Sequence, residues 1–145
     1  MFVEGILAKA HERLVTIAEK AQLIEAVKLL RVSDLVVVCN DDGVMVGVIT
    51  KTDAIVQISQ CPEDQCTGAI SSMMNRDVVQ CRPRDWLHDV WPKMKERGLK
   101  NIPITDHEVR PIGVLNARDA LQALLQEAED EEALLRDYVM GIGYQ

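Results

Sequence analysis

The chain has 145 residues, of which 48% are hydrophobic, and it carries a formal net charge of −7. This length allows one domain, or two small halves that fold together. The acidic balance argues against a nucleic acid or an anionic membrane surface as partner, because both select a basic face. The apolar runs are too short for a membrane span or a signal peptide, so we expect a cytoplasmic protein.

The first half predicts a strand, a helix, a hairpin and a second helix, in that order. An extended segment at 14–17 precedes apolar residues at helical spacing over 23–30. Strands are expected at 35–39 and 44–49, because the Asp-Gly pair between them is typical of a tight hairpin turn. A second helix begins near Thr50.

The second half predicts the same order of elements. A strand at 78–81 precedes a helix that ends at Gly98, since glycine commonly terminates helices. Strands at 101–105 and 112–115 form a second hairpin, and a helix begins near Asn116.

The tail predicts a second long helix over 122–138, rich in acidic residues and with one apolar stripe. A coiled-coil or dimer contact is one interpretation of this stripe. A solvated helix that packs on its own domain is the other.

The two halves are copies of one another. Gly-Val-Ile-Thr-Lys-Thr-Asp-Ala-Ile at 47–55 recurs as Gly-Val-Leu-Asn-Ala-Arg-Asp-Ala-Leu at 113–121, an offset of 66 residues. Upstream, Val15 matches Val79 at an offset of 64. A repeat of this kind determines the architecture.

These elements predict an α/β (α+β) fold of two β-α-β-β-α repeats, packed through their sheets with pseudo-twofold symmetry and followed by a C-terminal helix. One repeat alone is too small to bury its apolar face. The expected boundaries are 1–60 for the first repeat, 61–76 for a linker, 77–125 for the second repeat and 126–145 for the acidic helix and tail.

The reactive residue types point to no catalytic or metal centre. Cys39 and Cys81 lie in apolar runs and are expected to be small buried hydrophobic residues. Cys61 and Cys66 lie in the linker, where a redox role stays open. The spacing of the histidines is not that of metal ligands. The sequence shows no nucleophile–base pair, so we do not expect an enzyme.

Thr50 and Asp53 are the most informative polar pair. At a strand-to-helix junction, this spacing is typical of a capping box that satisfies backbone N–H groups. The same helix end could instead face an anionic ligand, with the carboxylate accepting hydrogen bonds from ribose hydroxyls.

The duplicated pattern, with Gly-hydrophobic-hydrophobic-Thr-x-x-Asp at the start of the second helix, resembles the CBS domain over about residues 1–125. Two copies resemble the tandem CBS pair, or Bateman module, of small stand-alone bacterial proteins. The resemblance implies a non-catalytic regulatory module that binds an adenosine nucleotide (AMP, ADP or ATP) between the copies. It implies no obligatory cofactor, a homodimer and an unknown regulated protein.

The resemblance also implies two clefts of unequal quality, where the matching Thr and Asp contact phosphate and ribose. The main site is expected to contain Thr50, Asp53, Met74, Asp77, Val79, Leu99, Lys100 and Arg118. The degenerate second site is expected to contain Asn116, Asp119, Val15 and Thr52. Its wall carries Asp34 where the main site has Lys100, which disfavours a phosphate.

Two alternatives remain beside the nucleotide sensor. One is a structural dimerisation module without a ligand. The other is a sensor of S-adenosylmethionine or NAD.

Overall fold

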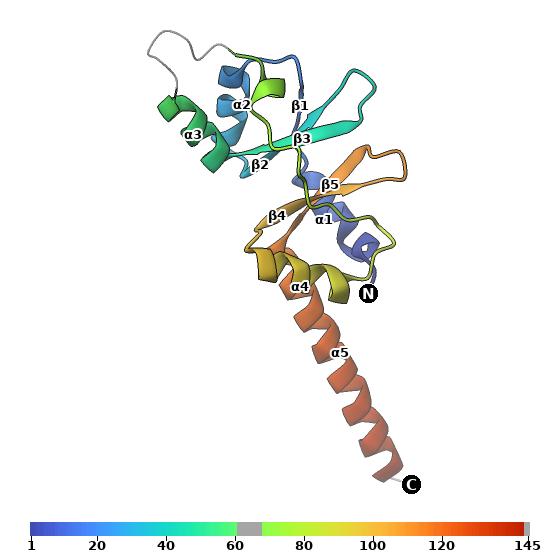
Figure 1. Cartoon of the computed structure of the whole chain (residues 1–145). Coiled ribbons are helices and arrows are strands. Elements are labelled where there is room, and N and C mark those ends of the chain that lie inside the picture. Colours follow the sequence, from blue (N-terminus) through green and yellow to red (C-terminus); the bar gives the residue numbers. More distant parts are fainter. Residues whose placement is uncertain (61–67, 144–145) are drawn as a thin grey trace.

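The computed structural model describes residues 1–60 and 68–143. An N-terminal segment comes first, with η1 (Val3–Ile6) and α1 (Leu7–Glu12). The first repeat contains β1 (Thr16–Ala18), α2 (Leu23–Leu30), β2 (Leu35–Cys39), β3 (Met45–Thr50) and α3 (Lys51–Gln60). After η2 (Ile70–Ser72), the second repeat contains α4 (Leu87–Arg97), β4 (Asn101–Thr105), β5 (Pro111–Asn116) and α5 (Ala117–Gly143). The two repeats stack end to end, and α5 continues away from them (Figure 1).

The first repeat forms a three-stranded sheet in the order β1-β2-β3. β1 pairs parallel to β2 with Thr16 opposite Val37, and β2 pairs antiparallel to β3 with Leu35 opposite Thr50. The first four residues of β2 are buried on both faces, which explains its continuous apolar sequence. The predicted β-α-β-β-α order is therefore present.

The second repeat forms only a two-stranded sheet, β4-β5, so the strand expected at 78–81 is reduced to a single parallel bridge between Cys81 and Ile104. The Cys81 N–H donates to the Pro103 carbonyl at 3.1 Å, and the Thr105 N–H donates to the Cys81 carbonyl at 2.9 Å. The next bonds of a parallel ladder would need N–H groups from Pro103 and Pro83. Proline has none, so the ladder cannot extend in either direction.

The N-terminal segment packs with the second repeat rather than the first. Val3 and Ala10 are buried in the core cluster that contains Leu87, Ile104 and Leu115, and α1 lies against β5. The chain therefore begins on the second repeat and returns to it after completing the first.

The sheets of the two repeats share an apolar cluster. Leu35, Val37 and Met45 of the first repeat pack with Val114 of the second. The Met45 N–H also donates to the carbonyl of Val109 at 2.9 Å. These contacts confirm the prediction that the repeats pack through their sheets.

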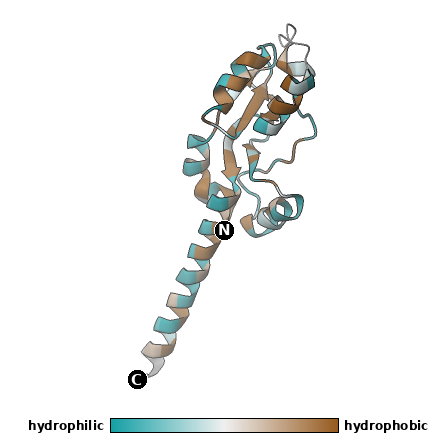
Figure 2. Ribbon diagram, turned by 90° about the vertical axis from the view of Figure 1, so that its left-hand side faces the viewer, coloured by the Kyte–Doolittle hydropathy of each residue, from teal (hydrophilic) through white to brown (hydrophobic). Residues whose placement is uncertain are grey.

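Helix α5 is one continuous helix from Ala117, not the two helices expected from the sequence. It packs on α4 and β5 over its first turns and then projects from the body (Figures 1 and 2). Gly98 ends α4 in the left-handed conformation, with φ of 64°, as predicted. No helix within 1–60 and 68–143 is both long enough and apolar enough to span a bilayer.

Candidate functional site

Thr50 and Asp53 form the capping box that the sequence predicts. The Asp53 N–H donates to Thr50 Oγ1 at 3.2 Å, and the Thr50 N–H donates to Asp53 Oδ2 at 3.0 Å. These bonds fix the Asp53 carboxylate at the positive end of α3, in a half-buried position.

A cleft opens beside this helix end, between the two repeats. It consists of two adjoining hollows of about 460 and 300 Å³ that share Leu35, Thr50, Leu99 and Asn101. We call it the Thr50 cleft. Its size is within the range of small-molecule sites.

The Thr50 cleft has a mixed charge with an excess of cations. Lys51, Arg97 and Lys100 line it, together with the carboxylates of Asp34 and Asp77. Asp34 is paired with Lys51 at 3.1 Å at the rim. Such a cleft suits a ligand with both hydroxyl groups and an anionic group.

A third hollow, of about 450 Å³, adjoins the cleft at Lys100. Arg118 and Asn116 line it, at the start of α5. The side chains of Lys100 and Arg118 are both exposed. These two cations are therefore available to one anion.

The structure brings together most of the residues expected in the main site. The cleft is lined by Thr50, Asp77, Val79, Leu99 and Lys100. Arg118 lies in the adjoining hollow. Asp53 lines none of these three hollows, but its carboxylate accepts the N–H of Thr50, which lines the cleft. Met74 is instead buried in the core of the first repeat, where its side chain packs against Gly47.

The residues expected in the second site are more dispersed. Thr52 lines the Thr50 cleft, Asn116 the third hollow and Val15 a separate pocket. The Asn116 side chain caps α5 by accepting the N–H of Asp119 at 3.2 Å and donates to Asn101 at 2.9 Å.

The Asp119 carboxylate is occupied by cations of the N-terminal segment. Arg13 Nε and Nη2 donate to its two oxygens at 2.6 and 3.2 Å, and Lys9 Nζ lies 3.3 Å away. Asp119 is only 8% exposed. Burial by itself raises the pKa of Asp119, but the hydrogen bonds and charges of Arg13 and Lys9 outweigh it, so the pKa lies below its ordinary value.

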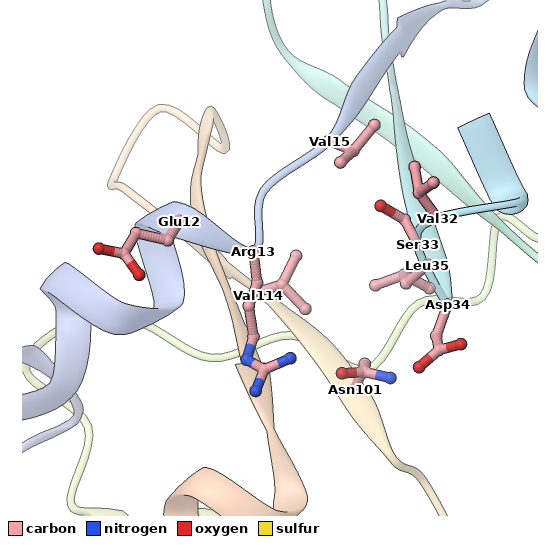
Figure 3. A pocket seen from close by; sticks show the side chains of 9 residues that line it. All are labelled: Glu12, Arg13, Val15, Val32, Ser33, Asp34, Leu35, Asn101 and Val114. Carbon is pink, nitrogen blue, oxygen red and sulfur yellow. The ribbon is translucent and has the colours of Figure 1, made fainter.

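Figure 3 shows the pocket beside this ion pair, which we call the Arg13 cleft. It has a volume of about 260 Å³, and Arg13 and Asp34 point toward it from opposite walls. Glu12 adds a second carboxylate to its lining. This cleft is smaller and more acidic than the Thr50 cleft.

The sequence interpretation missed Arg13, although the repeat contains a signal for it. At the offset of 64 that matches Val15 to Val79, Arg13 corresponds to Asp77. The Thr50 cleft thus contains the carboxylate of Asp77 at the position where the Arg13 cleft contains the guanidinium of Arg13. Because Arg13 and Asp119 are 106 residues apart, no local pattern predicts their pairing.

The described residues, 1–60 and 68–143, contain no cluster of three or more His, Cys, Asp or Glu residues suited to a metal ion. Burial, and to a lesser extent the charge of Asp85, raises the pKa of the Cys81 thiol to about 12. Burial also raises the pKa of Cys39. Cys81 is buried, as predicted, whereas Cys39 is only half-buried. Cys61 and Cys66 lie outside the described residues.

Two copies of one repeat that meet at a polar cleft define the class of this protein, a regulatory module of paired repeats. The family model of the CBS domain matches residues 3–59 and 70–126, which is more than half of the chain. The chain belongs to the CBS domain family and contains a CBS pair.

The curated relatives are distant. The uncharacterized protein MJ1225 of Methanocaldococcus jannaschii is 25% identical over 79% of this chain, and the choline transport ATP-binding protein OpuBA of Bacillus subtilis is 27% identical over 83%. The matches span 40% and 31% of these relatives. The chain thus spans well under half their length.

The solved structures support the same fold. The CBS-domain protein ATU1752 from Agrobacterium tumefaciens has a TM-score of 0.72 at 22% identity, over 85% of this chain and 98% of that one. CBSX2, solved in complex with AMP, has a TM-score of 0.72 at 18% identity, over 88% and 98% of the chains. The CBS pair of MJ0100, in complex with 5′-methylthioadenosine and S-adenosyl-L-methionine, has a TM-score of 0.70 at 22% identity, over 88% and 98%.

Proposed function

We propose that this CBS pair is a non-catalytic sensor that binds an adenosine nucleotide of the AMP, ADP or ATP class in the Thr50 cleft. The observation that supports it is the convergence of Thr50, Asp77 and Lys100 on one cleft between the repeats. In this proposal Asp53 accepts hydrogen bonds from the ribose, while Lys100 and Arg118 bind the phosphate. Val79 and Leu99 form the apolar wall for the base.

The sensor binds one nucleotide per chain. In the second cleft, the carboxylate that would receive the ribose is already paired with Arg13 and Lys9. A nucleoside entering there would displace these cations and leave the buried Asp119 carboxylate unpaired, which is costly. The lining of this cleft also carries two carboxylates, Glu12 and Asp34, against the single cation Arg13, which disfavours a phosphate.

Binding changes the activity of a regulated protein through the relative position of the two repeats or of two chains in a homodimer. The ligand can produce this change only by binding one arrangement more tightly than the other. The expected location is the cytoplasm.

The test is thermal unfolding with AMP, ADP, ATP, NAD and S-adenosylmethionine, followed by calorimetric titration of any ligand that shifts the transition. At 100 times its dissociation constant, a ligand adds about 2.7 kcal/mol, or roughly 5–10 °C at this chain length. We expect one adenosine nucleotide to give this shift with a stoichiometry of one, and Asp53→Ala to abolish it.

Glu25→Ala is the matched control, because Glu25 closes an equivalent capping box at the start of α2, where its carboxylate accepts the Gln22 N–H at 3.0 Å. Both substitutions remove a cap, worth about 0.5–2 kcal/mol, but only Asp53 belongs to the proposed site. An unchanged ligand shift in Asp53→Ala would refute the assignment. The absence of any shift in the nucleotide-free wild type would favour the ligand-free dimerisation module.

A further inference from the structure

Beyond its first turns, α5 exposes a series of large apolar side chains. From Ala128 to Gly141 every side chain is exposed. Leu134, Leu135, Tyr138 and Val139 are 66–69% exposed, and their spacing places them on one side of the helix. We call these four residues the tail face.

A helix of this length gains little stability in water without packing, so the tail face indicates a partner. Full-length pairing of two α5 helices is disfavoured. Five of the six residues over 127–132 are acidic, and this acidic band lies at the middle of Ala117–Gly143. In a parallel or an antiparallel pair, the acidic band of one helix would therefore lie beside the acidic band of the other, and the like charges would repel.

The complementary surface lies on the same chain, at the other end of the molecule. A groove of about 220 Å³ between α2 and α3 is lined by Val27, Ala54, Ile55 and Ile58, with Arg31 at its edge. We call it the α2–α3 groove. Ile55 is 66% exposed and Ile58 is 47% exposed.

The charges around this groove are opposite to those of α5. The charged residues that line the groove are Arg31 and Lys51, and both are cations, although Lys51 also pairs with Asp34 at 3.1 Å. An apolar groove edged by cations suits an apolar helix that carries an acidic band, because both the buried area and the charges are complementary.

The tail face cannot reach the groove of its own chain. Both views place α2 and α3 at one end of the molecule and the C-terminus at the opposite end (Figures 1 and 2). A second copy can supply the missing contact. If each chain places its tail in the groove of the other, the contact closes with twofold symmetry and leaves neither surface uncovered.

We propose that two copies of this chain form a reciprocal dimer in which the tail face of each docks into the α2–α3 groove of the other. This contact specifies the homodimer of the proposed function but requires no nucleotide. Neither surface includes the Thr50 cleft, apart from the shared rim residue Lys51.

The test measures the mass of the full-length chain by sedimentation and light scattering over a concentration series. We expect a dimer for the wild type. A tail variant, Leu135→Glu with Val139→Glu, and a groove variant, Ile55→Glu, should each weaken it at least about tenfold, because a charge is placed in an apolar contact. Val32→Glu is the control, since Val32 is 87% exposed and outside both surfaces. It should remain dimeric.

Mixing the two variants distinguishes this arrangement from other dimers. The tail of the groove variant and the groove of the tail variant are both intact, so a one-to-one mixture should recover a heterodimer with one of the two contacts. A monomeric wild type, a groove variant that stays fully dimeric, or a mixture that recovers nothing would each overturn the proposal. Circular dichroism confirms that the variants are folded.

The nucleotide shift is measured on the same proteins. A monomeric tail variant that still binds nucleotide supports the dimer contact and the sensor site independently. If the variants weaken the dimer as predicted but the protein binds no nucleotide, the result refutes the sensor function and still supports the dimer contact.

Discussion

Asp53 and Asp119 occupy equivalent positions in the two repeats, yet their carboxylates have different surroundings. The Asp53 carboxylate accepts the backbone N–H of Thr50, a residue that lines the Thr50 cleft. The Asp119 carboxylate is buried and is paired with two half-exposed cations from the N-terminal segment. Part of this difference lies at one position of the repeat, which is Arg13 in one copy and Asp77 in the other. Lys9 adds the second cation beside Asp119.

Arg13→Ala should therefore destabilise the fold by about 1–3 kcal/mol at pH 7, because it removes two hydrogen bonds from a buried carboxylate. The folded-state pKa of Asp119 lies below its ordinary value of about 3.9. Stability from the pair is therefore fully present above about pH 4 and lost as the pH falls through the folded pKa. Urea unfolding at a series of pH values from 7 to 3 measures this. The difference in the free energy of unfolding between wild type and Arg13→Ala should become smaller as the pH falls.

Arg136→Ala is the control for this series. Arg136 pairs with Glu132 at 2.7 Å, but both side chains are more than two-thirds exposed, so its loss should cost less than about 0.5 kcal/mol. If Arg13→Ala cost no more than this control at pH 7, the buried pair would contribute nothing to stability.

At the scale of elements, the two sheets are covered in equivalent ways. Helix α1 covers the sheet of the second repeat at Gly113, and the segment after η2 covers the sheet of the first repeat at Gly47. Gly47 and Gly113 are equivalent residues of β3 and β5. A Cβ on Gly113 would lie 3.0 Å from the Ala10 carbonyl carbon of α1. A Cβ on Gly47 would lie 2.9 Å from the Asn75 carbonyl oxygen. Each glycine therefore allows a neighbouring backbone to lie directly on its sheet.

Gly47→Ala and Gly113→Ala should each destabilise the chain by about 1–3 kcal/mol, because the added methyl forces the covering backbone away. Gly141→Ala is the matched control, since a Cβ there meets nothing within 4 Å. It should be neutral or stabilising by up to about 1 kcal/mol through helix propensity. Denaturant unfolding measures all three, and equal effects would contradict the close-packing interpretation.

The elements also show which features the sequence can predict. Both hairpins were predictable, because turn chemistry and apolar strands are local signals. The reduction of the strand at 78–81 to one bridge could not be predicted. Pro83 and Pro103 lack the N–H groups that would extend its ladder, and only the pairing of the strands shows that these N–H groups are needed. The convergence of Thr50 and Lys100 was an implication of the CBS resemblance. In contrast, α1 packs on β5 from the other end of the sequence, so no local pattern predicts its contacts.

At the scale of the whole molecule, the chain path joins the two repeats twice. The N-terminal segment packs with the second core before the first repeat is built, and a shared apolar cluster unites the sheets. Neither repeat keeps all its contacts when the other unfolds. The cleft lies at this junction, so a ligand there acts on the relative position of the repeats.

This arrangement predicts that the repeats unfold together. Ile49 and Leu115 are equivalent residues, 1% and 0% exposed, in the cores of the first and second repeats. Ile49→Ala and Leu115→Ala should each cost about 2–5 kcal/mol. Both should lower one shared transition with equal calorimetric and van't Hoff enthalpies, because the N-terminal segment and the shared apolar cluster couple the two cores. Calorimetry of Ile49→Ala is decisive: a second peak at the wild-type temperature would mean that the second repeat is stable alone. A single shifted peak would mean that ligand at the junction stabilises the entire chain.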